Sequence, residues 1–121
     1  MIKIVLIDNG LNRIRDLIFD DIDQGELGTD GTAATESDTD LIAGDANTTL
    51  PLDQATKADK AIQFDYVLPS TGGSTTTYRE YKLFSNASSV NYDRIVFTGI
   101  SFTTGGTEDL NVSKQYFIRQ V

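Results

Sequence analysis

The chain opens with an aliphatic run and then changes to apolar residues at helical spacing. Residues 2–7 read IKIVLI, a segment that suits either a strand or the lead-in to a helix. Apolar residues then recur every three or four positions, at Leu11, Ile14, Leu17 and Ile18. This spacing predicts a helix from about Asn9 to Asp20, apolar on one face, with Asp8 and Asn9 as N-cap candidates. Since so short a helix is marginal alone, we expect it to pack on another element.

A long polar segment follows the predicted helix. Residues 25–41 read GELGTDGTAATESDTDL, with almost no apolar content, and we expect an acidic Gly/Thr loop over about residues 25–45. Long ordered loops in compact domains are often functional. The loop is therefore our candidate contact surface, and its interface candidates are Thr29, Asp30, Thr32, Asp38 and Asp40.

Beyond the loop, apolar and polar residues alternate in short runs, as they do in strands. The predicted strands cover residues 61–68, 78–84, 92–98 and 110–118. A hairpin-type loop is expected at 70–75 and a turn at Gly105-Gly106, while Pro51 and Pro69 fall at element edges. The chain is therefore predicted to be mainly β: an antiparallel β-sandwich over about 46–121 with the short N-terminal helix packed against it, in a single domain of residues 1–121.

The aromatic residues divide into two groups. The phenylalanines are expected in the core, at Phe64, Phe84, Phe97, Phe102 and Phe117. The tyrosines suit either the core or an interface, since a tyrosine has an apolar ring and a polar end, at Tyr78, Tyr81, Tyr92 and Tyr116. Among them, Tyr78, Tyr81 and Tyr92 are interface candidates.

Charge is unevenly distributed along the chain, whose formal net charge is -8. Residues 1–65 carry 14 acidic against 5 basic residues, and residues 66–121 carry 4 against 5. The acidic half predicts either a solvated surface or a patch that meets a basic neighbour in an assembly. We expect no nucleic-acid partner and no binding to an anionic membrane, because both need a basic face.

The residue types present disfavour most catalytic chemistry. There are no cysteines and no histidines, so disulfides and Ser-His or Cys-His nucleophile pairs are excluded, and structural zinc is disfavoured. We expect no enzyme activity, no catalytic residues and no cofactor, with a carboxylate-based hydrolase as the enzymatic alternative. Calcium is the one metal considered, with Asp30, Asp38 and Asp40 as candidate ligands. Solvated turn acids that cap nearby amides are the alternative for these residues.

Four stretches, in order, resemble a group of small tail-fibre-like virion proteins of tailed phages, prophages and archaeal tailed viruses. They are NGLNRIRDLI at 9–18, GTDGTAATESDTDL at 28–41, YREYKLF at 78–84 and DRIVFTGISF at 93–102. The chain differs from the group at Asp30, where glycine is frequent, and at Lys82-Leu83, where the group has Gly-Leu.

The resemblance implies a non-enzymatic structural protein located in the virion. A tail, baseplate or fibre-anchoring component is the first expectation, with a capsid decoration (cement) protein and a receptor- or glycan-binding module as alternatives. Its expected partners are other copies of itself, as a trimer or hexamer, and neighbouring virion proteins. Such a protein acts through contacts, for which loops and edge strands are suited.

Overall fold

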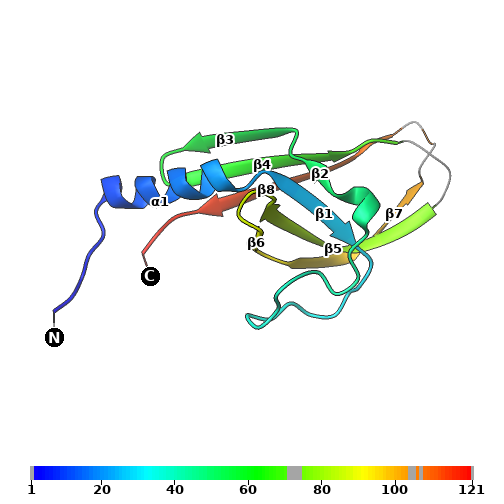
Figure 1. The fold of residues 1–121 in the computed structure, drawn as a ribbon, viewed down its shortest axis with the longest axis horizontal. Helices are drawn as coiled ribbons and strands as arrows, with labels where there is room; N and C mark the ends of the chain where they lie inside the picture. The colour runs from blue at the N-terminus through cyan, green and yellow to red at the C-terminus, as the bar shows by residue number, and fades with distance from the viewer. Residues whose placement is uncertain (1, 71–74, 104–105, 107, 121) are drawn as a thin grey trace.

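The computed structural model describes residues 2–70, 75–103, 106 and 108–120. Within them, two antiparallel sheets pack together and one α-helix lies beside them (Figure 1). The elements are α1 (Asp8–Asp21), β1 (Gln24–Gly28), the 3-10 helix η1 (Ala46–Thr48), β2 (Leu50–Pro51), β3 (Gln54–Ala58), β4 (Ala61–Leu68), β5 (Thr75–Ser85), β6 (Val90–Asn91), β7 (Ile95–Thr103) and β8 (Leu110–Phe117). The mainly β sandwich with one N-terminal helix is confirmed, whereas most of the expected 70–75 loop and Gly105 of the expected turn lie outside the described residues.

The first sheet is built around the long strand β5. Its strand order is β2-β1-β5-β6, and β7 also pairs with β5. The second sheet has the order β3-β4-β8, with β4 pairing along its whole length to β8. The predicted strand at 61–68 coincides with β4, and Pro51 lies in a two-residue edge strand, where proline is tolerated.

The core lies between the two sheets and is formed mainly by β1, β4 and β5. Its most completely buried apolar side chains are Tyr66, Tyr81, Phe64, Leu27, Ile62 and Leu83. The rings of Tyr66 and Tyr81 meet edge to face across the sheets, with centroids 5.4 Å apart. The expectation that Phe117 is a core residue was wrong, because Phe117 lies on the outer side of β8 and is 67% exposed.

The strand β1 corrects the predicted bounds of the acidic loop. Residues 25–28 were expected in the loop, and they contain only one large apolar residue, Leu27. Instead they belong to β1, whose residues 24–28 pair with residues 80–84 of β5, and Leu27 is completely buried opposite Tyr81. The sandwich therefore begins at Gln24 rather than near residue 46, and the loop itself starts at Thr29.

The helix α1 is one residue longer at each end than the spacing predicted. The expectation of a side-chain N-cap from Asp8 or Asn9 was wrong: the N-cap position is Ile7, and no side chain caps it. Asp8 lies in the first turn instead, where its charge interacts favourably with the helix dipole. Among the described residues, no helix is both long and apolar enough to cross a membrane.

Only part of the apolar face of α1 is covered by the sheets. Leu11 is buried and Ile18 packs against the core, but Ile14 and Leu17 are exposed. Polar contacts hold the helix beside the β3–β4 turn. The Arg15 guanidinium donates to the Ala58 carbonyl (2.6 Å), and the Asn12 side chain accepts from the Lys60 amide (2.8 Å).

Candidate functional site

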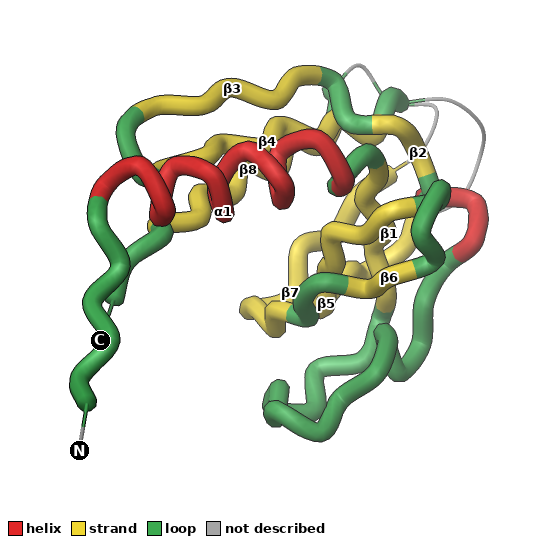
Figure 2. Tube along the Cα trace, turned by 60° about the vertical axis from the view of Figure 1, so that its left-hand side comes forward, coloured by secondary structure: helices red, strands yellow, loops and turns green. Residues whose placement is uncertain are grey.

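The segment of residues 29–44, called the acidic loop below, leaves the first sheet and returns to the point where it began. Gly28 and Gly44 form an antiparallel bridge, and the Thr29 amide donates to the Ala43 carbonyl at 3.0 Å. Figures 1 and 2 show the loop extending from this closed neck. A compact surface loop with its ends together is an Ω-loop, a class that is frequently functional.

Glycine is needed at the neck because the loop passes very close to the sheet. A Cβ atom at Gly28 would lie 2.7 Å from the Ala43 carbonyl oxygen and 2.7 Å from Cγ of Glu80. Such distances are shorter than any ordinary van der Waals contact, so only a residue without a side chain fits here.

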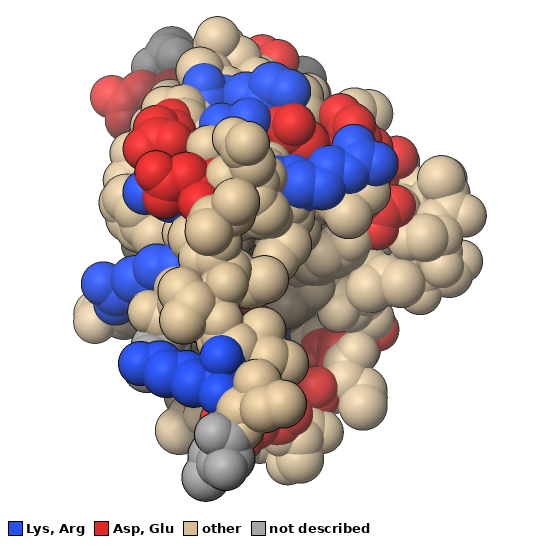
Figure 3. Space-filling view, turned by 90° about the vertical axis from the view of Figure 1, so that its left-hand side faces the viewer, with Lys and Arg blue, Asp and Glu red and all other residues tan. Residues whose placement is uncertain are grey.

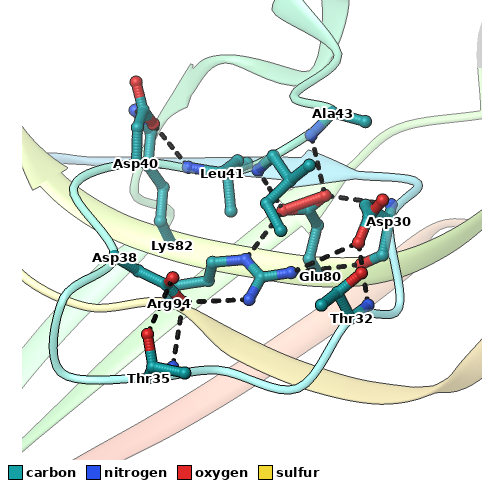
Figure 4. Close-up of polar contacts among 11 residues, drawn as sticks. Asp30, Thr32, Thr35, Asp38, Asp40, Leu41, Ala43, Glu80, Lys82 and Arg94 are labelled. Atoms are coloured by element: carbon teal, nitrogen blue, oxygen red, sulfur yellow. Dashed lines mark hydrogen bonds and ion pairs between the residues drawn. The ribbon is translucent and has the colours of Figure 1, made fainter.

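Glu80 lies beneath the acidic loop, on the face of the first sheet that points away from the second. A polar side chain on this face would ordinarily meet water, yet Glu80 is completely buried. Its carboxylate accepts hydrogen bonds from three loop amides, Asp30 N (2.9 Å), Ile42 N (2.8 Å) and Ala43 N (3.0 Å). One side chain on β5 therefore holds both arms of the loop (Figure 4).

Arg94 completes this anchor from the opposite side. Its side chain is 3% exposed, and its Nε donates to Glu80 at 3.0 Å. Its Nη1 donates to Asp38 at 3.1 Å, and its Nη2 lies 3.7 Å from the Asp30 carboxylate. The guanidinium thus joins the sheet to two acids on opposite arms of the loop (Figure 4).

The surroundings keep both anchor groups charged at neutral pH. Burial alone raises the pKa of Glu80, but the hydrogen bonds from Ala43, Arg94, Ile42 and Asp30 outweigh it and hold this pKa below its ordinary value. Burial alone lowers the pKa of Arg94, but Glu80 and Asp38 outweigh it and raise this pKa. The anchor is therefore a hydrogen-bonded buried ion pair.

Lys82 forms a second anchor, two residues after Glu80 on the same face of β5. Its ammonium lies 2.7 Å from Asp40, donates to the Asn91 side chain at 2.9 Å and sits 4.4 Å from the centre of the Phe84 ring. Asn91 in turn donates to the Thr39 carbonyl at 3.0 Å. The returning arm of the loop is thereby tied to β5 and β6.

The tip of the loop, residues 31–37, is exposed but has its own internal hydrogen bonds. The Thr32 amide donates to Asp30 at 2.8 Å, and the Thr35 amide donates to Asp38 at 3.0 Å. Apart from Glu36, the tip carries small or uncharged side chains. The tip is therefore an internally hydrogen-bonded and largely uncharged surface.

The five loop residues predicted as interface candidates are brought together, but they face different ways. Thr29 and Thr32 are exposed, whereas Asp30, Asp38 and Asp40 contact the cations beneath the loop. The three aspartates do not converge on a metal site: in the described part of the chain, no cluster of three or more acidic side chains could hold a metal ion. In this structure they form ion pairs with Arg94 and Lys82 and accept hydrogen bonds from loop amides.

The tyrosine candidates lie mostly inside the molecule. Tyr78 is 3% exposed and Tyr81 is completely buried, so placing them at an interface was wrong and both are core residues. Tyr92 is half-buried, and its hydroxyl donates to Asp21 at the end of α1. The strand β5 is irregular between Tyr78 and Glu80. This bulge lets both Tyr78 and Tyr81 point into the core, although they are three residues apart.

Sequence reasoning missed the residues that anchor the loop, which are Glu80, Lys82 and Arg94. A weak signal was present, since Glu80 and Lys82 alternate with Tyr81 and Leu83 and must share the outer face of their strand. On an ordinary sandwich that face is solvated. Only the position of the loop shows that these charges are covered.

The residues between β6 and β7 form a bulge whose three side chains reach three different elements. Residues 92–94 were expected to begin a strand, but Phe84 pairs with Asn91 and Tyr81 pairs with Ile95, which leaves them outside the ladder. Tyr92 contacts α1, and Arg94 contacts the loop. Asp93 accepts from the Leu83 amide and the Tyr116 hydroxyl, and lies 2.9 Å from the Lys114 ammonium.

Some of the acidic residues of the first half of the chain are paired with basic residues of the second half. The acidic half supplies Asp30, Asp38 and Asp40, and the other half supplies Lys82 and Arg94, which pair with them. On the face of the molecule where α1 begins, acidic and basic side chains are interspersed, with uncharged residues between them (Figure 3). Asp30, Asp38 and Asp40 therefore find basic groups within the same chain.

Comparison of the chain with protein-family models, with curated proteins and with solved structures found no match.

Proposed function

We propose that this chain is a non-enzymatic structural subunit of a tailed-virus particle, most simply a tail, baseplate or fibre-anchoring component. The four stretches in order support the virion assignment. Its partners would be further copies of itself, as a trimer or hexamer, and neighbouring virion proteins. The acidic loop would form one of the contact surfaces.

The observation that carries this proposal is the way in which the exposed loop is held. A loop with few apolar residues would ordinarily be flexible, and ordering it at an interface would cost conformational entropy. Here Glu80 and Arg94 hold both arms before any partner arrives. A preorganised, largely uncharged tip is suited to repeated contacts of fixed geometry.

The receptor- or glycan-binding alternative loses the feature that motivated it. It depended on exposed tyrosines, but Tyr78 and Tyr81 are in the core. The hydroxyls of Tyr92 and Tyr116 are hydrogen-bonded to Asp21 and Asp93. No exposed aromatic platform was found among these four residues.

Labelling of purified particles tests the proposal directly. Antibodies raised against the purified, untagged chain would be located on the particles by electron microscopy, so that the loop tip stays unaltered. We expect label at the tail or baseplate. Label over the capsid shell would support the decoration-protein alternative instead, and purified particles that lack the chain would overturn the virion assignment.

A further inference from the structure

Residues 2–7, called the arm below, are the most exposed apolar segment of the described chain. Ile2 is 90% exposed, Ile4 is 79% exposed and Ile7 is 68% exposed. The arm pairs with no described strand, and the Leu6 amide donates to the Gln120 side chain at 2.8 Å. A β-branched, apolar run of this length is a strand former that lacks a sheet.

The second sheet has an edge that is incompletely covered. On the central strand β4, the inward side chains Ile62, Phe64 and Tyr66 are at most 1% exposed. On β8, the inward side chains Val112 and Tyr116 remain only partly buried. The free edge of β8 therefore lacks the neighbour that covers β4.

The first sheet is open on the same side. On β7, Ile95 is 38% exposed and Ile100 is 43% exposed. A cavity of about 350 Å³ lies between the ends of the two edge strands, and its lining includes Ile100, Phe102 and Leu110. The sandwich is thus closed by β2 and β3 on one side and open between β7 and β8 on the other.

The other sheet edges are poor templates for an added strand. β2 has only two residues, and one of them is Pro51. β3 is polar and carries Lys57, and Arg15 of the helix already occupies the Ala58 carbonyl. β7 faces the irregular part of β5, whereas β8 keeps one register with β4 over eight residues.

We propose that the arm of one copy adds as a strand to the free edge of β8 in a second copy. Six residues in an extended conformation span about 20 Å, within the length of β8. Ile2, Ile4 and Leu6 would share one face and cover the half-buried inner side of β8. Lys3, Val5 and Ile7 would share the outer face.

The acceptor is a second copy because the arm leads away from its own sandwich. α1 begins at Asp8, directly after the arm, so no linker is available to reverse the direction of the chain. Figure 1 shows residues 2–7 extending beyond the end of α1, away from the sheets. This inference rests on the proposed function, since it names the partner and the contact by which the subunit would self-assemble.

Disulfide trapping tests the pairing, because the chain has no cysteines of its own. Two preparations of the full chain would be mixed and oxidised, one with Lys3→Cys and the other with Gln115→Cys or Ser113→Cys on the outer face of β8. We expect covalent heterodimers for at least one of the two β8 positions. The matched control, Lys3→Cys mixed with Thr56→Cys on β3, should give at least tenfold less.

Light scattering on the untagged chain and on Ile4→Asp gives an independent readout. Since Ile4 is exposed, this substitution should leave the melting temperature of the monomer unchanged but convert the oligomer to monomer. An oligomer that survives Ile4→Asp, or trapping at β3 rather than β8, would overturn the inference and leave the proposed function standing. A wild-type chain that is monomeric and gives no disulfide-trapped heterodimer would also overturn the inference. Particle labelling would then test the proposed function separately.

Discussion

The acidic loop and the arm each differ from what their composition predicts about burial and anchoring. The loop is polar and acidic, as solvated segments usually are, yet Glu80 and Arg94 tie it down through buried charges. The arm is apolar, as buried strands usually are, yet its isoleucines are exposed. Composition predicts burial only on average, and the partners available in space decide each case.

The comparison also separates the two proposed contact surfaces. The loop is organised within the monomer, so its shape depends on electrostatics within one chain. The arm has no partner strand in the described chain, and in our proposal a second copy buries it. Conditions that alter charge should therefore disturb the loop, and conditions that alter association should disturb the arm.

Acid should have the largest effect on the loop because it removes several anchors together. The pKa values of Asp30, Asp38, Asp40 and Glu80 lie below their ordinary values in the folded chain. As pH falls, these carboxylates therefore bind protons at a higher pH in the unfolded chain than in the folded chain. The stability that they contribute is lost as pH falls below about 4.5. Calorimetry from pH 6 to pH 2.5 should show a falling melting temperature. A melting temperature that stays constant down to pH 3 would contradict this account.

Arg94→Met should be the most damaging of the single substitutions considered. It leaves the Glu80 carboxylate buried without its cation, for which a cost of about 3–5 kcal/mol is typical. Urea unfolding would measure the loss. The control is Arg79→Met, on the exposed side of β5, which should change the free energy of unfolding by less than about 0.5 kcal/mol. Equal effects of the two substitutions would show that the ion pair is not an anchor.

Truncating one apolar side chain in each region should sharpen the contrast. Leu27→Ala removes a fully buried side chain from the core and should cost about 2–5 kcal/mol. Ile4→Ala, in the arm, should cost less than about 0.5 kcal/mol in the dilute monomer. Both can be compared by urea unfolding at low protein concentration. A large loss for Ile4→Ala in the monomer would place the arm within its own fold.

Two glycine substitutions should change the free energy of unfolding in opposite directions. Gly28→Ala brings a methyl group into the Ala43 carbonyl and Glu80, and should destabilise the chain by about 1–3 kcal/mol. Gly10→Ala, within α1, meets only Leu6 at 4.0 Å and should stabilise the chain by about 0.5–1 kcal/mol. Thermal unfolding of both variants measures the difference, and stabilisation by Gly28→Ala would show that the neck has room.

The parts of the fold that were predictable depend on nearest neighbours in the sequence. The helical spacing of Leu11, Ile14 and Ile18 placed α1 to within one residue at each end. Alternation at 61–68 gave the bounds of β4. β1 was missed because it contains two glycines and one large apolar residue, and its conformation depends on pairing with β5, more than fifty residues away.

The candidate site consists of the loop and the residues beneath it, and only the loop was predicted. The Gly/Thr/Asp composition identified the loop and its exposed residues Thr29 and Thr32. The partners Glu80 and Arg94 lie 50 and 56 residues from Asp30 and Asp38, the loop acids that each contacts. No local pattern specifies contacts at that separation, because they depend on which strands pair and which face the loop covers.

Local patterns in the sequence were enough to predict the helix α1 and the alternating strand β4, but not β1, whose conformation depends on pairing with β5. Tertiary structure alone decided which charges are paired, which tyrosines are buried and which apolar run is left uncovered. The physical reason is that dihedral preferences act between neighbouring residues, whereas burial and ion pairing depend on distances in space. A polar loop could therefore be anchored by buried charges, and an apolar run could remain exposed.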